Sequence, residues 1–157
     1  MNTSEVLSNI AKYGFIMQKP VAPVANYVSV KQAGEVLFVS GQLPIEDGKI
    51  KYSGQVGSEC SEEMAAKAAE LCAFNLLTQV YYFLGESFEG LKECVKLEVL
   101  VHSASGFANH SKIANGASDL MVATLGEAGK HTRVSIGVSS LPLNAAVEVA
   151  AIFSLSK

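Results

Sequence analysis

The spacing of hydrophobic residues along the chain changes several times, and each regular stretch predicts an element. Apolar and small residues recur every three or four positions over 61–84, which predicts a long helix. Ser61 can cap this helix and Gly85 can end it. The same spacing predicts a second long helix over 107–125 and a short one over 3–14.

Alternation of apolar and polar residues predicts the strands. Two such runs, 26–31 and 35–40, flank a glycine-containing turn and predict a hairpin. Further strands are predicted at 50–53, 94–101, 132–138 and 146–155. We therefore expect an α+β fold with one mixed six-stranded sheet and two long helices on one face. The opposite face would then be covered by other subunits.

Composition fits this architecture. The chain has 157 residues, of which 49% are hydrophobic and only 17% charged, so one domain with a sizeable core and a permanent subunit interface is expected. No apolar run approaches the ~18 residues that a membrane span needs, and the N-terminus lacks the pattern of a secretory signal.

Charge and cysteine content narrow the function classes. A net charge of −3 without a basic cluster argues against a nucleic-acid partner. The three cysteines show no metal-ligand spacing, so we expect neither a metal nor a cofactor. They indicate small buried residues in a reducing compartment, with the cytoplasm as the default.

Arg133 is the most informative residue, because the other eleven of the twelve basic residues are lysines. Arginine offers a planar fork that can hold a carboxylate or phosphate through two hydrogen bonds. A structural ion pair and a side chain that reaches along the surface to water are the alternatives.

The last two predicted strands suggest a partner for Arg133. Alternation puts Arg133, Ser135 and Gly137 on one face of the first strand, and Glu148 on the polar face of the second. If the two strands pair antiparallel with their valine faces together, Ser135 lies opposite Glu148 and Arg133 lies diagonal to it.

Three motifs then carry a resemblance to a known family. The motifs are Ala25-Asn26-Tyr27, Phe38-Val39-Ser40-Gly41-Gln42-Leu43-Pro44, and Arg133-Val134-Ser135-Ile136-Gly137-Val138 with Leu141-Pro142 and Val147-Glu148-Val149-Ala150-Ala151-Ile152. By these motifs the chain resembles the Rid proteins (reactive intermediate deaminases), also called the YjgF or L-PSP endoribonuclease family, over about residues 20–157. Residues 1–19 would form an N-terminal helical extension.

The resemblance implies a homotrimer of chorismate-mutase-like folds with three clefts between subunits. It also implies metal- and cofactor-independent hydrolysis of enamine and imine intermediates such as 2-aminoacrylate and 2-iminopropanoate. By the same resemblance, Arg133 binds the substrate carboxylate, Glu148 positions or activates the attacking water, and Tyr27 lines the cleft.

Two positions depart from the pattern of the family. Ser135 stands where a cysteine is common, and it joins the candidate substrate-binding residues; Gly137 stands where an acidic residue is frequent. Asn115 is a further candidate that either caps a pocket or ends a packing face. His131 shares the parity of Arg133, whereas His102 and His110 have the character of ordinary residues.

Two other function classes remain open. An endoribonuclease is suggested by one family name but lacks a basic groove. A non-catalytic module that binds a small carboxylated metabolite would need Arg133 equally. Glu148 separates hydrolysis from binding, because only a hydrolase depends on its carboxylate.

Overall fold

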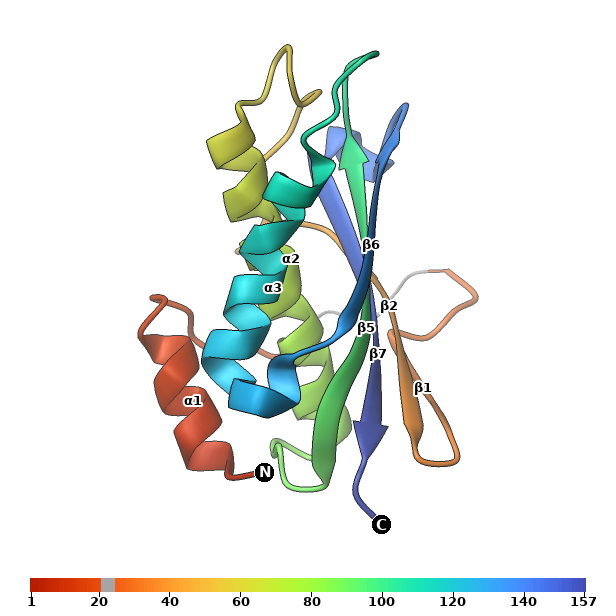
Figure 1. Ribbon diagram of the computed structural model, residues 1–157. Coiled ribbons are helices and arrows are strands. Elements are labelled where there is room, and N and C mark those ends of the chain that lie inside the picture. Colours follow the sequence, from red (N-terminus) through yellow and green to blue (C-terminus); the bar gives the residue numbers. More distant parts are fainter. Residues whose placement is uncertain (21–24) are drawn as a thin grey trace.

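The computed structural model describes residues 1–20 and 25–157. The two long helices of this part of the chain cover one face of a mixed sheet (Figure 1). The helices are α1 (Thr3–Ala11), α2 (Glu62–Phe83) and α3 (His110–Leu125), with two short 3₁₀ turns at Gly126–Gly129 and Pro142–Asn144. The strands are β1 (Val30–Ala33), β2 (Val36–Gln42), β3 (Ile45–Glu46), β4 (Lys49–Ile50), β5 (Leu91–His102), β6 (Thr132–Val138) and β7 (Val147–Leu155). The predicted α+β class is confirmed.

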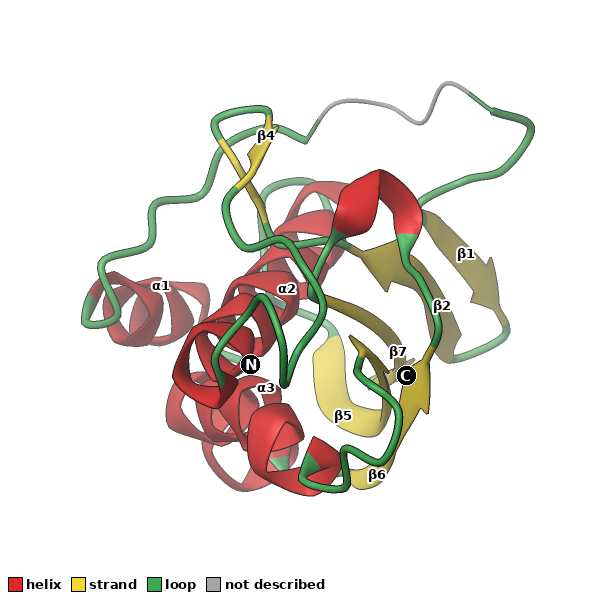
Figure 2. Cartoon of the chain, turned by 90° about the horizontal axis from the view of Figure 1, so that it is seen from above, coloured by secondary structure: helices red, strands yellow, loops and turns green. Residues whose placement is uncertain are grey.

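The main sheet has five strands in the order β1-β2-β7-β5-β6, so the prediction of six strands is wrong (Figure 2). The segment expected to supply the sixth strand instead contributes β4, which pairs only with β3 in a separate two-stranded sheet. The predicted hairpin is present as β1 and β2, which pair antiparallel. In Figure 2, β1 and β6 lie at opposite edges of the main sheet.

The predicted pairing of the last two strands is also wrong. β5 lies between β6 and β7; it runs parallel to β6 and antiparallel to β7. The physical reason is the connection, because β5, α3 and β6 form a strand–helix–strand unit, and such a crossover joins parallel neighbours. The chain then passes the end of β5 through Leu143 and Asn144, both with positive φ, before it enters β7.

The predicted signals at the ends of α2 are confirmed. Ser61 Oγ accepts a hydrogen bond from the Met64 amide at 3.2 Å, and Gly85 adopts a φ of 77° just beyond the helix. The two long helices approach closely at Gly116 of α3, where a Cβ atom would collide with the backbone carbonyl of Ala66 on α2. Small residues at this contact therefore let both helices lie on the sheet.

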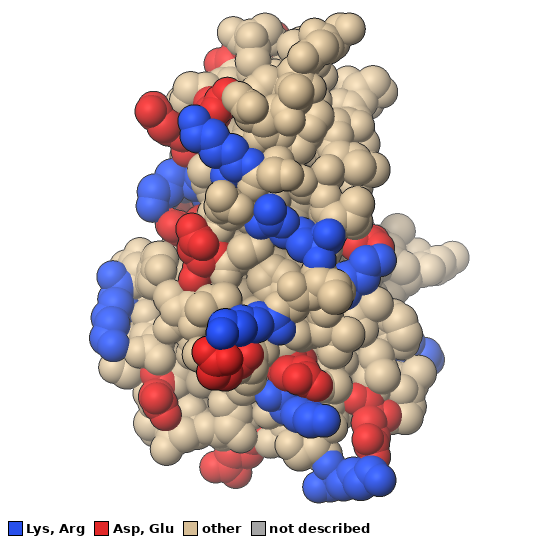
Figure 3. Space-filling view, in the orientation of Figure 1, with Lys and Arg blue, Asp and Glu red and all other residues tan. Residues whose placement is uncertain are grey.

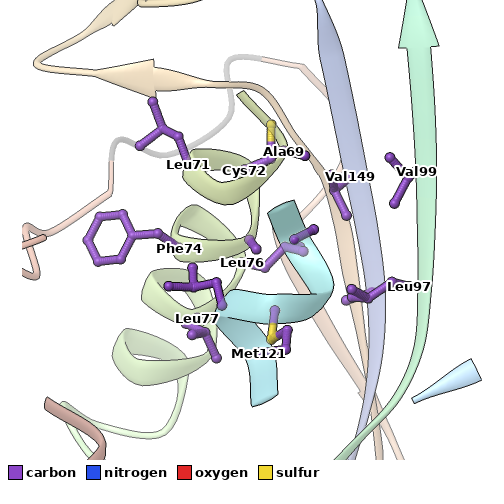
Figure 4. Packing of buried hydrophobic residues seen from close by; sticks show 14 of the residues in the cluster. Ala69, Leu71, Cys72, Phe74, Leu76, Leu77, Leu97, Val99, Met121 and Val149 are labelled. Atoms are coloured by element: carbon purple, nitrogen blue, oxygen red, sulfur yellow. The ribbon is translucent and has the colours of Figure 1, made fainter. Parts of the chain in front are cut away.

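The hydrophobic core fills the space between these helices and the sheet (Figure 4). Cys72 and Leu76 of α2 point toward the sheet, where they meet the buried faces of β7 and β5; Leu71 and Phe74 point away from the sheet. Phe74 stacks on Phe15 with ring centroids 4.5 Å apart, so the outer face of α2 is covered by the N-terminal segment.

The short N-terminal helix is present and belongs to this packing. Val6 and Ile10 of α1 are buried in the core cluster, and α1 contacts α3 on the side away from the sheet (Figure 1). In the described parts of the chain, no helix is long and apolar enough to cross a membrane.

In the described part of the chain, the other face of the sheet carries no helix, and it exposes large apolar side chains. Phe38 of β2 is 47% exposed, and Val134 and Ile136 of β6 are 41% and 48% exposed. Apolar side chains that stay exposed on one face of a sheet suit that face to an interface.

Candidate functional site

Arg133 lies on β6, one of the two edge strands of the main sheet, and its side chain is held against α3. Nη1 donates to Asn115 Oδ1 and to Ser118 Oγ, both at 3.0 Å, and Nη2 donates to the Ser111 carbonyl at 3.3 Å. The three acceptors follow one another along one side of α3. Asn115 is therefore in contact with Arg133, and its role in capping a pocket stays a prediction.

The charge of Arg133 has no counter-charge among residues 1–20 and 25–157. None of the ion pairs in this part of the chain includes Arg133, and all three of its partners are neutral oxygens. A guanidinium has five N–H donors, so Nε–H and one Nη2–H are left without a partner within the described chain. An exposed arginine in this state is suited to an anionic ligand.

Glu148 lies on the opposite face of the sheet. Its neighbours Val147 and Val149 are buried toward the helices, so the side chain between them projects to the face without helices. There it covers Gly41 of β2 so closely that a Cβ atom on Gly41 would collide with Glu148 Oε1. Glu148 is half-buried, and this burial raises the pKa of its carboxyl above the ordinary value.

A bulge in β2 produces the position that Glu148 covers. Between the pairs Val39–Ala151 and Gln42–Val149, β2 has one residue more than β7. The extra residue turns Gln42 toward the helices, where its Oε1 accepts from Gln79 Nε2 at 3.2 Å. The Ser40-Gly41-Gln42 segment thus serves close backbone approach.

The prediction that Arg133 and Glu148 share one face is wrong within a single chain. Arg133 and Ser135 pair with Leu97 and Val99, whose side chains are buried under the helices. Glu148 pairs with Leu100, which points the other way. The error follows from the strand order. Alternation divides the residues of one strand between two faces, but matching the faces of two strands by their pairing requires that the strands be neighbours.

The remaining candidates are divided between the two edges of the sheet. Ser135 is half-buried on the Arg133 face, and Gly137 follows it, where a Cβ atom would collide with Ser103 Oγ and His110 Nε2. Tyr27 is 57% exposed and precedes β1. Four strand spacings, roughly 19 Å, separate β1 from β6, so Tyr27 and Arg133 of one chain do not meet.

Sequence reasoning missed Ser118 and Ser111 as partners of Arg133. The signal was available, because Ser111, Asn115 and Ser118 recur at spacings of four and three on a predicted helix and so share one face. The described residues contain no group of three His, Cys, Asp or Glu side chains that could hold a metal.

The fold is that of an α+β protein of the chorismate-mutase-like kind. The family model described as "YjgF/chorismate mutase-like, putative endoribonuclease" matches residues 8–155. The chain belongs to this family. The match begins inside the predicted N-terminal extension, whose boundary at residue 19 stays a prediction.

Individual relatives agree with this assignment. The chain is 39% identical over 155 residues to protein TCP17 of Trypanosoma cruzi, which covers 98% of this chain and 96% of TCP17. Protein Atu1372 of Agrobacterium tumefaciens is similar in structure, with a TM-score of 0.92, 40% identity and coverage of 98% and 94%. A protein of Shewanella oneidensis MR-1, described as a "putative endoribonuclease", is similar with a TM-score of 0.89 and 29% identity. The match covers 96% of this chain and 99% of that protein.

Proposed function

We propose that this protein hydrolyses reactive enamine and imine intermediates of the 2-aminoacrylate and 2-iminopropanoate type, releasing ammonia. The observation that carries the proposal is the state of Arg133, whose charge is unneutralised and whose guanidinium keeps two donors unpaired after three hydrogen bonds to α3. A carboxylate is the planar anion that such a pair of donors fits. An imino acid supplies that carboxylate beside its reactive carbon.

Glu148 supplies the acid–base chemistry in this proposal. Water adds to the imine carbon as the carboxylate removes a proton, and the resulting tetrahedral amino alcohol collapses to a keto acid and ammonia when a proton is returned to nitrogen. Burial raises the pKa of Glu148, which brings proton uptake and release closer to neutral pH. The residues in these roles need no metal or cofactor.

The site is completed in our proposal by a second copy of the chain. Arg133 lies on the edge strand β6. Tyr27 precedes β1 at the other edge of the sheet, and Glu148 lies over Gly41 on the open face. The exposed Phe38, Val134 and Ile136 suit that face to burial in an assembly. A homotrimer with its clefts between subunits would bring Arg133 of one subunit to Glu148 and Tyr27 of another.

Ammonia release from 2-iminopropanoate generated in situ tests the proposal. The wild-type protein is expected to exceed the buffer rate, and Arg133→Lys is expected to lose most of that rate, because lysine replaces the fork with a point charge. A wild-type rate equal to that of buffer, across several imino acids, would refute hydrolysis.

A binding module without catalysis is separated from a hydrolase by Glu148→Gln. A hydrolase loses turnover but still binds carboxylates, whereas a binder tolerates the change. Cleavage of RNA is the less favoured alternative, since Figure 3 shows basic residues interspersed with acidic ones on the face it displays, without the continuous basic tract that follows a nucleic-acid backbone.

A further inference from the structure

A second layer of polar residues lies behind Arg133. Ser118 Oγ, which accepts from Arg133 Nη1 at 3.0 Å, is also 2.9 Å from His131 Nε2. His131 Nδ1 is in turn 2.6 Å from the carbonyl oxygen of Gly129, at the end of the 3₁₀ turn that follows α3. Three hydrogen bonds thus connect the guanidinium to a fixed point of the backbone.

Only one direction of donation satisfies this chain of bonds when the imidazole is neutral. The Gly129 carbonyl can only accept, so His131 Nδ1 carries the proton and Nε2 is left as an acceptor. The Ser118 hydroxyl must therefore donate to Nε2. Its lone pairs are then available to Arg133, which can only donate.

We propose that Ser118 and His131 are the positioning residues of the Arg133 anion site, an inference that rests on the proposed function for its catalytic meaning. An arginine side chain has several rotatable bonds, and a ligand that must order it loses affinity. The Ser118–His131 pair fixes one edge of the guanidinium before a ligand arrives. The donors on its other side are then presented to the cleft in one orientation.

The chain also contains a matched control pair. Ser103 Oγ and His110 Nε2 lie 3.1 Å apart at the other end of α3, beside Gly137 of the same strand. Neither residue contacts Arg133 among the hydrogen bonds of the described chain. Ser103→Ala therefore removes an equivalent serine–histidine bond at the same helix–strand contact without touching the arginine.

The single arginine makes the proposal directly measurable. A ¹⁵N-labelled sample has one arginine Nε–H signal, which belongs to Arg133, so its heteronuclear NOE reports the mobility of that side chain alone. Ser118→Ala and His131→Asn are expected to lower this heteronuclear NOE, because the Arg133 side chain becomes more mobile. Ser118→Ala removes the acceptor for Arg133, and His131→Asn removes the acceptor for the Ser118 hydroxyl. His131→Gln keeps an acceptor near the Nε2 position and should remain close to wild type, as should Ser103→Ala. Equal rigidity of the signal in Ser118→Ala, His131→Asn and wild type would overturn the proposal.

Affinity separates positioning from a merely structural role. Pyruvate, a stable carboxylate analogue of the substrate, is titrated while the same signal is followed. Ser118→Ala should weaken the pyruvate Kd about tenfold, the scale of one charge-assisted hydrogen bond, whereas Ser103→Ala should change only Tm. If pyruvate leaves the wild-type signal unmoved while the mobility differences persist, carboxylate binding fails and the positioning of Arg133 stands. If pyruvate binds all variants equally, the positioning role fails.

Discussion

Arg133 and Glu148 project from opposite faces of the central sheet, Arg133 toward α3 and Glu148 over Gly41 on the face without helices. Their strands are also separated by β5. A small imino acid cannot contact both residues of one chain across a packed sheet. The proposed chemistry therefore requires two copies of the chain, and that requirement can be tested without a structure of the assembly.

Mixed oligomers are expected to recover activity that neither parent possesses. Arg133→Ala and Glu148→Gln should each be inactive alone, but co-assembled subunits form some clefts with both residues intact. For random mixing at equal amounts, about one quarter of the clefts are intact in a cyclic oligomer. The measurement is ammonia release after co-refolding. Activity in the mixture no higher than in the separately refolded variants would show that the two residues do not act across an interface.

Introducing a charge on the open face should separate the subunits. Ile136→Glu places a carboxylate on an apolar side chain that is 48% exposed in the single chain and would be desolvated in an assembly. Light scattering should report a smaller particle, and deamination should fall with it. Phe83→Glu is the matched control, because Phe83 is 43% exposed at the end of α2, on the helical side of the sheet. Wild-type protein that is monomeric at micromolar concentration would contradict the trimer itself.

The positions of the helices and strands along the chain could be predicted from the sequence, whereas the order of the strands in the sheet could not. The period of apolar residues correctly assigned α2, α3 and the last two strands, and parity correctly put Arg133 and Gly137 on one face. Parity describes a strand by itself. The order of the strands depends on the helical connection between β5 and β6, which makes these two strands parallel neighbours.

The same distinction holds for the candidate site. Arg133 was identified because it is the only arginine, and Asn115 because of its place on the helix. Their hydrogen bond depends on how far α3 is displaced along β6, which no local pattern encodes. Ser118 contributes to the site only through that displacement. Glu148 was singled out as the one acid of its strand, but the bulge that gives it room lies on another strand.

Replacing Glu148 should change stability in a pH-dependent way. Burial raises the pKa of this carboxyl in the folded state, so the folded chain favours the protonated form. That contribution is fully present below the unfolded pKa, about 4.3, and is lost as pH rises through the folded pKa. Glu148→Gln cannot ionise, so its advantage in unfolding free energy over wild type should increase from about pH 4 to neutral pH.

Urea unfolding at both pH values measures this difference. Glu89→Gln, which removes one charge at an exposed position, is the control for net charge. An advantage of Glu148→Gln that is larger at low pH than at neutral pH would contradict desolvation as the cause of the shift. Turnover should be lost at both pH values, because the amide cannot accept the proton from water.

Adding one methyl group at Gly41 should disturb the site through Glu148. The Cβ atom of Gly41→Ala would occupy the space of Glu148 Oε1, so the carboxylate must move. Because the end of a flexible side chain can give way, the cost is expected to be about 1 kcal/mol, the low end for overpacked sites. Deamination should fall together with stability. The double variant Gly41→Ala/Glu148→Ala identifies the cause, because the shorter side chain leaves room for the methyl group. In a double-mutant cycle, the destabilisation by Gly41→Ala should largely disappear in the Glu148→Ala background. If the two changes are additive, the strain lies in the β2 backbone. The destabilisation by Gly41→Ala would then not come from contact with the Glu148 carboxylate.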